Sequence, residues 1–261
     1  RDAQESRGLG DVYKRQPRDI SFDPDSSVVY LVLEDGTLSC LTTYRTEAVT
    51  AWCKLNTAGK FISAAVIGDN IYFCVERKNG WFIEKFVDDY YSDCSLRLTS
   101  ETPQRDWSGL EHLEGEEVVV LANGFSLGKF KVEEGEVHLL DEADEIIAGL
   151  PYEHLIEPLP YMVEAERPYS PKALRVIGAR FRILDSKSFC IDIGSGYFHY
   201  PLKRIHRDKI FDSPPLTYSG DVQMRALGWI REMNKPMWSI KSDEPLAFTL
   251  LSAVAEIKLK E

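Results

Sequence analysis

The sequence ISFDPDSSVVYLVLEDGTLSCLTTY, from Ile20 to Tyr44, predicts three short strands joined by two turns. Its apolar runs have strand length, and the Asp35-Gly36 pair separates two of them. Such a pair predicts a two-residue hairpin turn in which both residues need a positive φ. We therefore expect an antiparallel meander in this stretch.

The same pattern returns further along the chain. ISAAVIGDNIYFCVERKNGWFIEKF begins at Ile62, and Asn79-Gly80 takes the place of Asp35-Gly36. The first unit has a fourth apolar run, Val49–Leu55, so that its four strands match the repeat length of propeller blades, about 40 to 50 residues. The repeat predicts one propeller-type blade and most of a second.

Two blades alone would leave their faces uncovered, because blades are stabilised by stacking on their neighbours. The remaining blades would come from sequence preceding this chain or from its C-terminal region. The alternative is that the two units are unrelated hairpins in a β-sandwich.

The rest of the chain also favours strands over helices. Residues 92–106 are polar and predict a turn-rich connection, and short strands over residues 107–160 predict a small closed or half-closed β-barrel. Residues 161–261 form a predicted C-terminal β-region that completes the main body. It would begin with a strand pair, Ala173–Leu184 and Phe189–Ile193, across the turn Asp185-Ser186-Lys187-Ser188. We expect an all-β protein, with the blades at residues 17–106.

The first sixteen residues are a special case. Back-translation of Asp11–Gln16, DVYKRQ, gives GAT GTG TAT AAG AGA CAG, which resembles a transposon end used in sequencing libraries. We expect residues 1–16 to be such an adaptor artefact, the alternative being a disordered basic tail.

Charge and composition restrict the function classes. The net charge of −11 argues against wrapping nucleic acid, which requires Lys and Arg to neutralise phosphates. It does not exclude a surface along which DNA slides without sticking. No apolar stretch approaches the length of about 20 residues that spans a bilayer, so we expect no membrane segment.

The five cysteines lie far apart in the sequence and form no CxxC unit. This spacing predicts no zinc or redox motif, and we expect buried free thiols in a reducing compartment. They are Cys40, Cys53, Cys74, Cys94 and Cys190.

Motifs for catalysis and cofactor binding are absent from the sequence. Asp88 and Asp89 are candidates for paired catalytic carboxylates, but acids in loops are usually solvated. The five histidines form neither HxH nor HExxH, and there is no GxSxG, P-loop or GxGxxG motif. We expect no enzyme activity, no cofactor and no metal.

One segment, Gly194–Phe211, combines aromatic with basic residues. Aromatic side chains beside basic ones can stack on bases and contact phosphates. The alternative is an exposed connection whose basic groups pair with acidic neighbours or with an adjacent subunit. The candidate contact residues for nucleic acid or a subunit are Tyr197, Lys203, Arg204, Arg207 and Lys209.

Several phrases together resemble a known family. They are YLVLEDGTLSCLTTYRTEAVTAW from Tyr30, AVIGDNIYFCVERKNGWFIEKF from Ala65, GLEHLEGEEVVVLANG from Gly109, and SGDVQ with DEPLAFTLLSAVAEIKL from Asp243. The stretch from Pro17 to Glu261 resembles the C-terminal part of the tail nozzle proteins of short-tailed bacteriophages, also called tail tubular protein B or stabilisation proteins. The middle barrel is similar to an FCCH-like domain.

The resemblance implies a mechanical role. The chain would be a virion protein assembled in the bacterial cytoplasm, forming a hexameric ring with copies of itself and docking on the adaptor and other tail proteins. DNA would pass through without sequence-specific binding, and no catalytic residue is implied.

Two alternative functions, an enzyme and a binding protein, are also considered. A tail-associated glycan hydrolase would need Asp88 or Asp89 near a second carboxylate. A glycan-binding propeller would expose aromatics such as Trp81 and Trp107 around a pocket.

Overall fold

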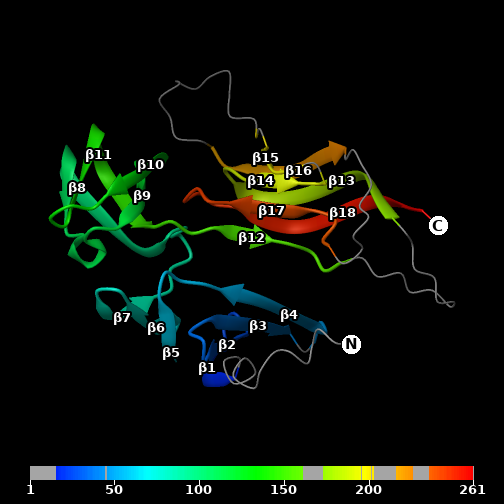
Figure 1. Ribbon diagram of the computed structural model, residues 1–261, viewed down its shortest axis with the longest axis horizontal. Coiled ribbons are helices and arrows are strands. Elements are labelled where there is room, and N and C mark those ends of the chain that lie inside the picture. The colour runs from blue at the N-terminus through cyan, green and yellow to red at the C-terminus, as the bar shows by residue number, and fades with distance from the viewer. Residues whose placement is uncertain are drawn as a thin grey trace. The chain divides into compact units, whose positions relative to one another are not determined.

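The computed structural model in Figure 1 describes residues 16–44, 46–160, 173–194, 196–200, 202, 216–225 and 235–260. The segment expected to be an artefact therefore lies outside the described residues, apart from Gln16. Strands form five antiparallel sheets in these ranges, and the only helical piece described is the single 3-10 turn Glu111–Leu113. The expected all-β class is confirmed. Over the described ranges the sheets are open, without a closed barrel or a propeller.

The repeat in the first part of the chain is confirmed as two antiparallel meanders. The first sheet pairs its strands in sequence order, β1 (Pro17–Asp23), β2 (Val28–Leu33), β3 (Leu38–Tyr44) and β4 (Val49–Leu55). The second sheet has the order β5 (Lys60–Ile67), β6 (Asn70–Arg77) and β7 (Gly80–Lys85). The second meander thus lacks a counterpart of β4.

The hairpin turns differ from the expected geometry. The Gly36 N–H donates to the Leu33 carbonyl and the Leu33 N–H donates to Thr37, both at 2.9 Å, so the first loop has three residues. In that loop only Gly36 has a positive φ, of 81°. The prediction that both turn residues need a positive φ is therefore wrong. A three-residue loop whose last residue is a left-handed glycine closes the hairpin instead.

The two meanders bury their inner faces in one shared core. Its aromatic centre is Phe73, whose ring lies 5.7 Å from Tyr30 and 5.2 Å from Phe61, both edge-on. The Asp19 carboxylate of β1 accepts the N–H of Ala64 on β5 at 2.9 Å. The fully buried or nearly buried members are Tyr30, Val32, Leu38, Cys40, Phe61, Phe73 and Val75.

The cysteines are only partly as expected. Cys40 is 3% exposed, but Cys53 is exposed, so the prediction of buried thiols is wrong for this residue. The reason is that β4 is the last strand of its sheet and is exposed along almost its whole length.

The polar segment 92–106, expected to be rich in turns, instead belongs to a long strand, β8 (Asp93–Ser108). Its sheet has the order β10 (Phe125–Lys131), β9 (Glu117–Ala122), β11 (Glu136–Leu150), β8. As an edge strand with mostly exposed side chains, β8 needs no apolar alternation. Most of the buried apolar residues of the sheet come from β9 and β11, including Val118, Val120, Val137, Ile146 and Ala148, all at 0% exposure.

The C-terminal part contains two further sheets. One has the order β16 (Tyr218–Arg225), β13 (Ala173–Ser186), β18 (Thr249–Lys260). The other has the order β12 (His154–Ile156), β17 (Ser239–Ser242), β14 (Cys190–Asp192), β15 (Phe198–His199). The predicted pairing of Ala173–Leu184 with Phe189–Ile193 is wrong, because β13 and β14 belong to different sheets.

A change of sheet between β13 and β14 explains this error. Ser186 Oγ accepts the N–H of Thr249 at 3.0 Å, and the Lys187 N–H donates to Ala247 at 2.9 Å. These bonds attach the connection to the segment that leads into β18. The chain then continues into the second sheet instead of returning along β13.

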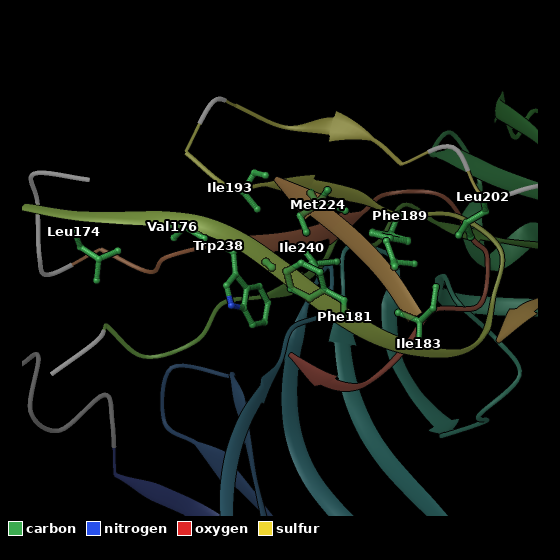
Figure 2. Packing of buried hydrophobic residues seen from close by; sticks show 13 residues of the cluster. Leu174, Val176, Phe181, Ile183, Phe189, Ile193, Leu202, Met224, Trp238 and Ile240 are labelled. Atoms are coloured by element: carbon green, nitrogen blue, oxygen red, sulfur yellow. The ribbon is translucent and has the colours of Figure 1, made fainter. Parts of the chain in front are cut away.

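Both C-terminal sheets contribute to one apolar core, as in a β-sandwich (Figure 2). Phe181 of β13 packs edge-on against Trp238, with ring centroids 5.1 Å apart. Phe189 stacks on Tyr200 at 5.5 Å. The two sheets are therefore held together mainly by aromatic and aliphatic burial.

Gly36 provides a test of the packing between the two meanders. An alanine Cβ at this position would lie 2.6 Å from Lys60 Cβ, and a left-handed conformation costs a non-glycine residue about 1–3 kcal/mol. We expect Gly36→Ala to lower the free energy of unfolding by more than this backbone cost alone, measured by urea denaturation.

Gly68→Ala is the matched control, because Gly68 also has a positive φ, of 56°, with no atom within 4 Å of the added Cβ. Equal losses in the two variants would show that the close approach at Gly36 contributes nothing.

Candidate functional site

The predicted aromatic and basic segment is described only at its beginning. Lys203, Arg204, Arg207 and Lys209 lie outside the described residues. Tyr197 is described and is 42% exposed. Its hydroxyl shares a hydrogen bond of 2.6 Å with Ser239 Oγ, which attaches it to β17.

Lys241 determines what the Tyr197 ring can contact. The Lys241 Nζ atom lies 4.6 Å from the ring centroid, and the same ammonium is 3.4 Å from Glu153 Oε2. The cation covers one face of the ring. This arrangement fits a hydrogen-bonded surface contact better than an open platform for stacking bases.

A serine and a histidine meet close to this position. Ser188 Oγ is 2.9 Å from His199 Nε2, the separation expected of a nucleophile and its base. However, Ser188 is only 1% exposed, so a substrate carbonyl has no access to its oxygen. The pair fastens β15 to the connection before β14.

The acids and tryptophans of the two alternative hypotheses do not form the expected groups. Asp88 and Asp89 are both exposed, whereas the carboxyl group of a catalytic acid usually lies in a buried site. Trp81 is 64% exposed, whereas Trp107 is 2% exposed, so these two residues do not form a common aromatic rim. No set of three or more His, Cys, Asp or Glu residues suited to a metal occurs in the described ranges.

A basic surface that the sequence reasoning missed lies on the outer face of the β16-β13-β18 sheet. Arg182 of β13 donates from Nε to Asp221 Oδ1 of β16 at 2.8 Å, and Arg180 and Arg225 are also exposed. The hydrogen bond from Arg182 lowers the pKa of Asp221, and Arg180 adds to this effect. This surface could have been predicted from the sequence, because Arg180 and Arg182 are two residues apart. In a strand, that spacing places both side chains on the same face.

A buried cluster of charged side chains joins β6, β7 and the start of β8. Arg77 of β6 bonds to Glu84 of β7 and to Asp93, the first residue of β8, with Nη2 2.7 Å from Glu84 Oε2 and 2.9 Å from Asp93 Oδ1. Asp93 also accepts the Thr57 hydroxyl and the Ala58 N–H. Its oxygens and the guanidinium therefore bond to protein groups, which indicates a structural cluster.

Burial opposes the charge on Arg77, but the bonds to Glu84 and Asp93 outweigh it and raise the pKa of Arg77. The guanidinium consequently stays charged, and its removal would leave two carboxylates facing each other. Sequence reasoning missed this cluster because its members come from three separate strands.

Comparison with known proteins gives no assignment, since neither a protein-family model nor a curated protein matches this chain. In the described ranges, no helix has the length and apolar character needed to cross a membrane.

The Arg77 cluster yields a stability prediction. Removing one partner of a buried pair typically costs about 3–5 kcal/mol. We expect Arg77→Met to fall at the lower end, because Glu84 retains 22% exposure of its side chain. The loss is measured by urea denaturation at neutral pH.

Arg182→Met is the matched control, since it breaks an Arg–carboxylate pair whose arginine side chain is 62% exposed, and such pairs contribute little. A similar loss in both variants would contradict the structural role of the Arg77 cluster.

Proposed function

We propose that this chain is a structural protein of a short-tailed bacteriophage tail, part of a ring or nozzle through which the genome passes. The family resemblance from Pro17 to Glu261 supports this proposal. The two meanders agree with the blade-like repeat that the resemblance implies. The net charge of −11 suits a wall that repels DNA phosphates.

The observation that carries the proposal is the open edge at β7. Trp81 is 64% exposed and Ile83 is 75% exposed, and as alternate residues of one strand they lie on the same face. In the first meander the third strand is covered by a fourth, β4, whereas in the second meander the third strand, β7, is itself the edge of its sheet. An apolar strand edge of this kind is a ready site for strand addition.

Self-association would use this edge. A strand from another copy can complete the second meander through backbone hydrogen bonds, with Trp81 as the aromatic anchor. The proposed assembly is a hexameric ring docked on the tail adaptor. The protein would have no catalytic role in it.

The finer architecture belongs to the same proposal. The two meanders would be propeller-type blades, with further blades supplied by sequence preceding this chain or by its C-terminal region. The sheet of β8 to β11 would be the FCCH-like small barrel, and the C-terminal sandwich would complete the main body.

A second candidate is glycan binding. Exposed Trp81 favours it, because tryptophan rings stack on sugars, but the burial of Trp107 leaves this hypothesis with one of its two aromatics. The hydrolase alternative has less support, since Asp88 and Asp89 are exposed to solvent.

We expect the 261-residue chain to form oligomers in sedimentation velocity and rings in negative-stain electron microscopy. Trp81→Glu should weaken this association about tenfold or more, the effect of losing a central interface residue. Leu140→Glu is the control, because Leu140 is an exposed apolar residue, at 87%, on a different sheet.

A chain that remains monomeric at all concentrations would contradict the proposed ring. If Trp81→Glu instead abolishes binding to a glycan array while the wild-type chain is monomeric, the second candidate is correct.

A further inference from the structure

Two cysteines that are distant in the sequence are direct neighbours in the first sheet. Cys40 of β3 and Cys53 of β4 are register partners in the antiparallel ladder. Partners in such a ladder have Cα atoms about 4.5 to 5.5 Å apart and side chains on the same face. Disulfides form at Cα separations of about 4.4 to 6.8 Å. The backbone therefore already provides the spacing that a disulfide needs.

The two thiols have different environments. Cys40 is 3% exposed, whereas Cys53 is exposed on the edge strand. The hydrogen bond between the thiols lowers the pKa of Cys53 to about 7 and, together with burial, raises the pKa of Cys40. Cys53 thus has the accessible thiolate, and Cys40 is held beside it as the second thiol.

The other cysteines have no such partner. Cys74 is opposite Ser63 and Ile83, and Cys190 is opposite His199 and Lys241. The Cys94 thiol donates from Sγ to Glu84 Oε1 at 3.5 Å, and burial, followed by the charge of Glu84, raises the pKa of Cys94 to about 12. All five cysteines lie in the described part of the chain, so the pairing of Cys40 with Cys53 is specific.

We propose that Cys40 and Cys53 form a reversible cross-strand disulfide that fastens edge strand β4 to β3 when the chain meets a low-molecular-weight disulfide such as oxidised glutathione. This inference does not depend on the proposed phage function. It rests on the strand register and on the exposure of one of the two thiols.

The reaction is a thiol–disulfide exchange in two steps. The Cys53 thiolate attacks one sulfur of oxidised glutathione, and the first glutathione leaves as a thiolate. Cys40 then gives up its proton and attacks the Cys53 sulfur, which releases the second glutathione. Two cysteine thiols are oxidised, one glutathione disulfide is reduced to two thiols, and the cysteine protons end on the departing glutathiones.

The disulfide would strengthen the attachment of β4 to the rest of the first sheet. Nearly every side chain of β4 is exposed, so ladder bonds to β3 are its main attachment. A covalent link across this ladder closes the loop between the two strands and restricts the unfolded chain. Oxidation should therefore raise the melting temperature, and reduction should restore the original value.

The test uses the 261-residue chain in glutathione buffers of defined redox ratio, with free thiols then blocked by N-ethylmaleimide. Mass spectrometry of the intact chain should show the loss of two hydrogens, and peptide mapping should link Cys40 to Cys53. The rate of disulfide formation should rise as the pH increases through about 7, because the fraction of Cys53 present as the reactive thiolate increases. Thermal unfolding of oxidised and reduced chains gives an independent readout.

Three variants distinguish the Cys40–Cys53 disulfide from a glutathione adduct and from reactions of the other cysteines. Cys53→Ser should abolish both the disulfide and the redox dependence of the melting temperature, and its exposed position should tolerate serine. Cys40→Ala should stop at a glutathione adduct on Cys53. Cys74→Ser is the matched control and should behave like the wild type.

A wild-type chain that accumulates the glutathione adduct without forming the Cys40–Cys53 link would overturn the proposal. So would a disulfide between other cysteines, or a shift in melting temperature that persists in Cys53→Ser.

Discussion

A short antiparallel sheet can bury one face fully only if another layer covers that face, and this constraint organises four of the five sheets that the structure describes. The first and second meanders cover each other through Tyr30, Phe61 and Phe73. The two C-terminal sheets do the same around Phe181 and Trp238. The outer faces and the last strands are left to solvent. Exposed groups such as Trp81, Cys53 and Arg182 are accordingly found on edges and outer faces.

The charged side chains also differ in role according to whether they are buried or exposed. Arg77 is enclosed by Glu84, Asp93 and backbone groups, so its charge has a stabilising role. Arg182 and Asp221 are exposed on an outer face, where water screens their attraction. Charge alone would not have separated these two pairs, since both join one arginine to carboxylate. Burial determines that the first is a structural element and the second is part of a surface available for contact.

The sequence predicted local structure well where the pattern was local. Glycine-containing turns and apolar runs indicated both meanders, because hairpins are encoded by neighbouring residues. The strand β8 was missed, since its polar side chains carry no alternation and its pairing with β11 depends on distant residues. The pairing of β13 was wrong for a related reason. Its true partners, β16 and β18, follow much later in the sequence.

The candidate site shows the same limit. Tyr197 was identified from its neighbours in sequence, but its partners Ser239 and Lys241 come from another strand. The pairing of Cys40 with Cys53 was also missed, because a motif search looks for close spacing and strand register brings together residues that lie further apart. The Arg77 cluster combines three strands and could not be read from any one of them.

The position of the boundary between the two compact units has a practical meaning. Apart from His112–Glu114, which belong to the first unit, the chain divides between Cys94 and Ser95, inside β8, and Asp93 at the start of that strand is bonded to Arg77. Boundaries between domains usually lie in exposed linkers. Here, cutting the chain at the boundary would sever a strand and expose its unpaired end. The two units should therefore be produced and studied as one polypeptide.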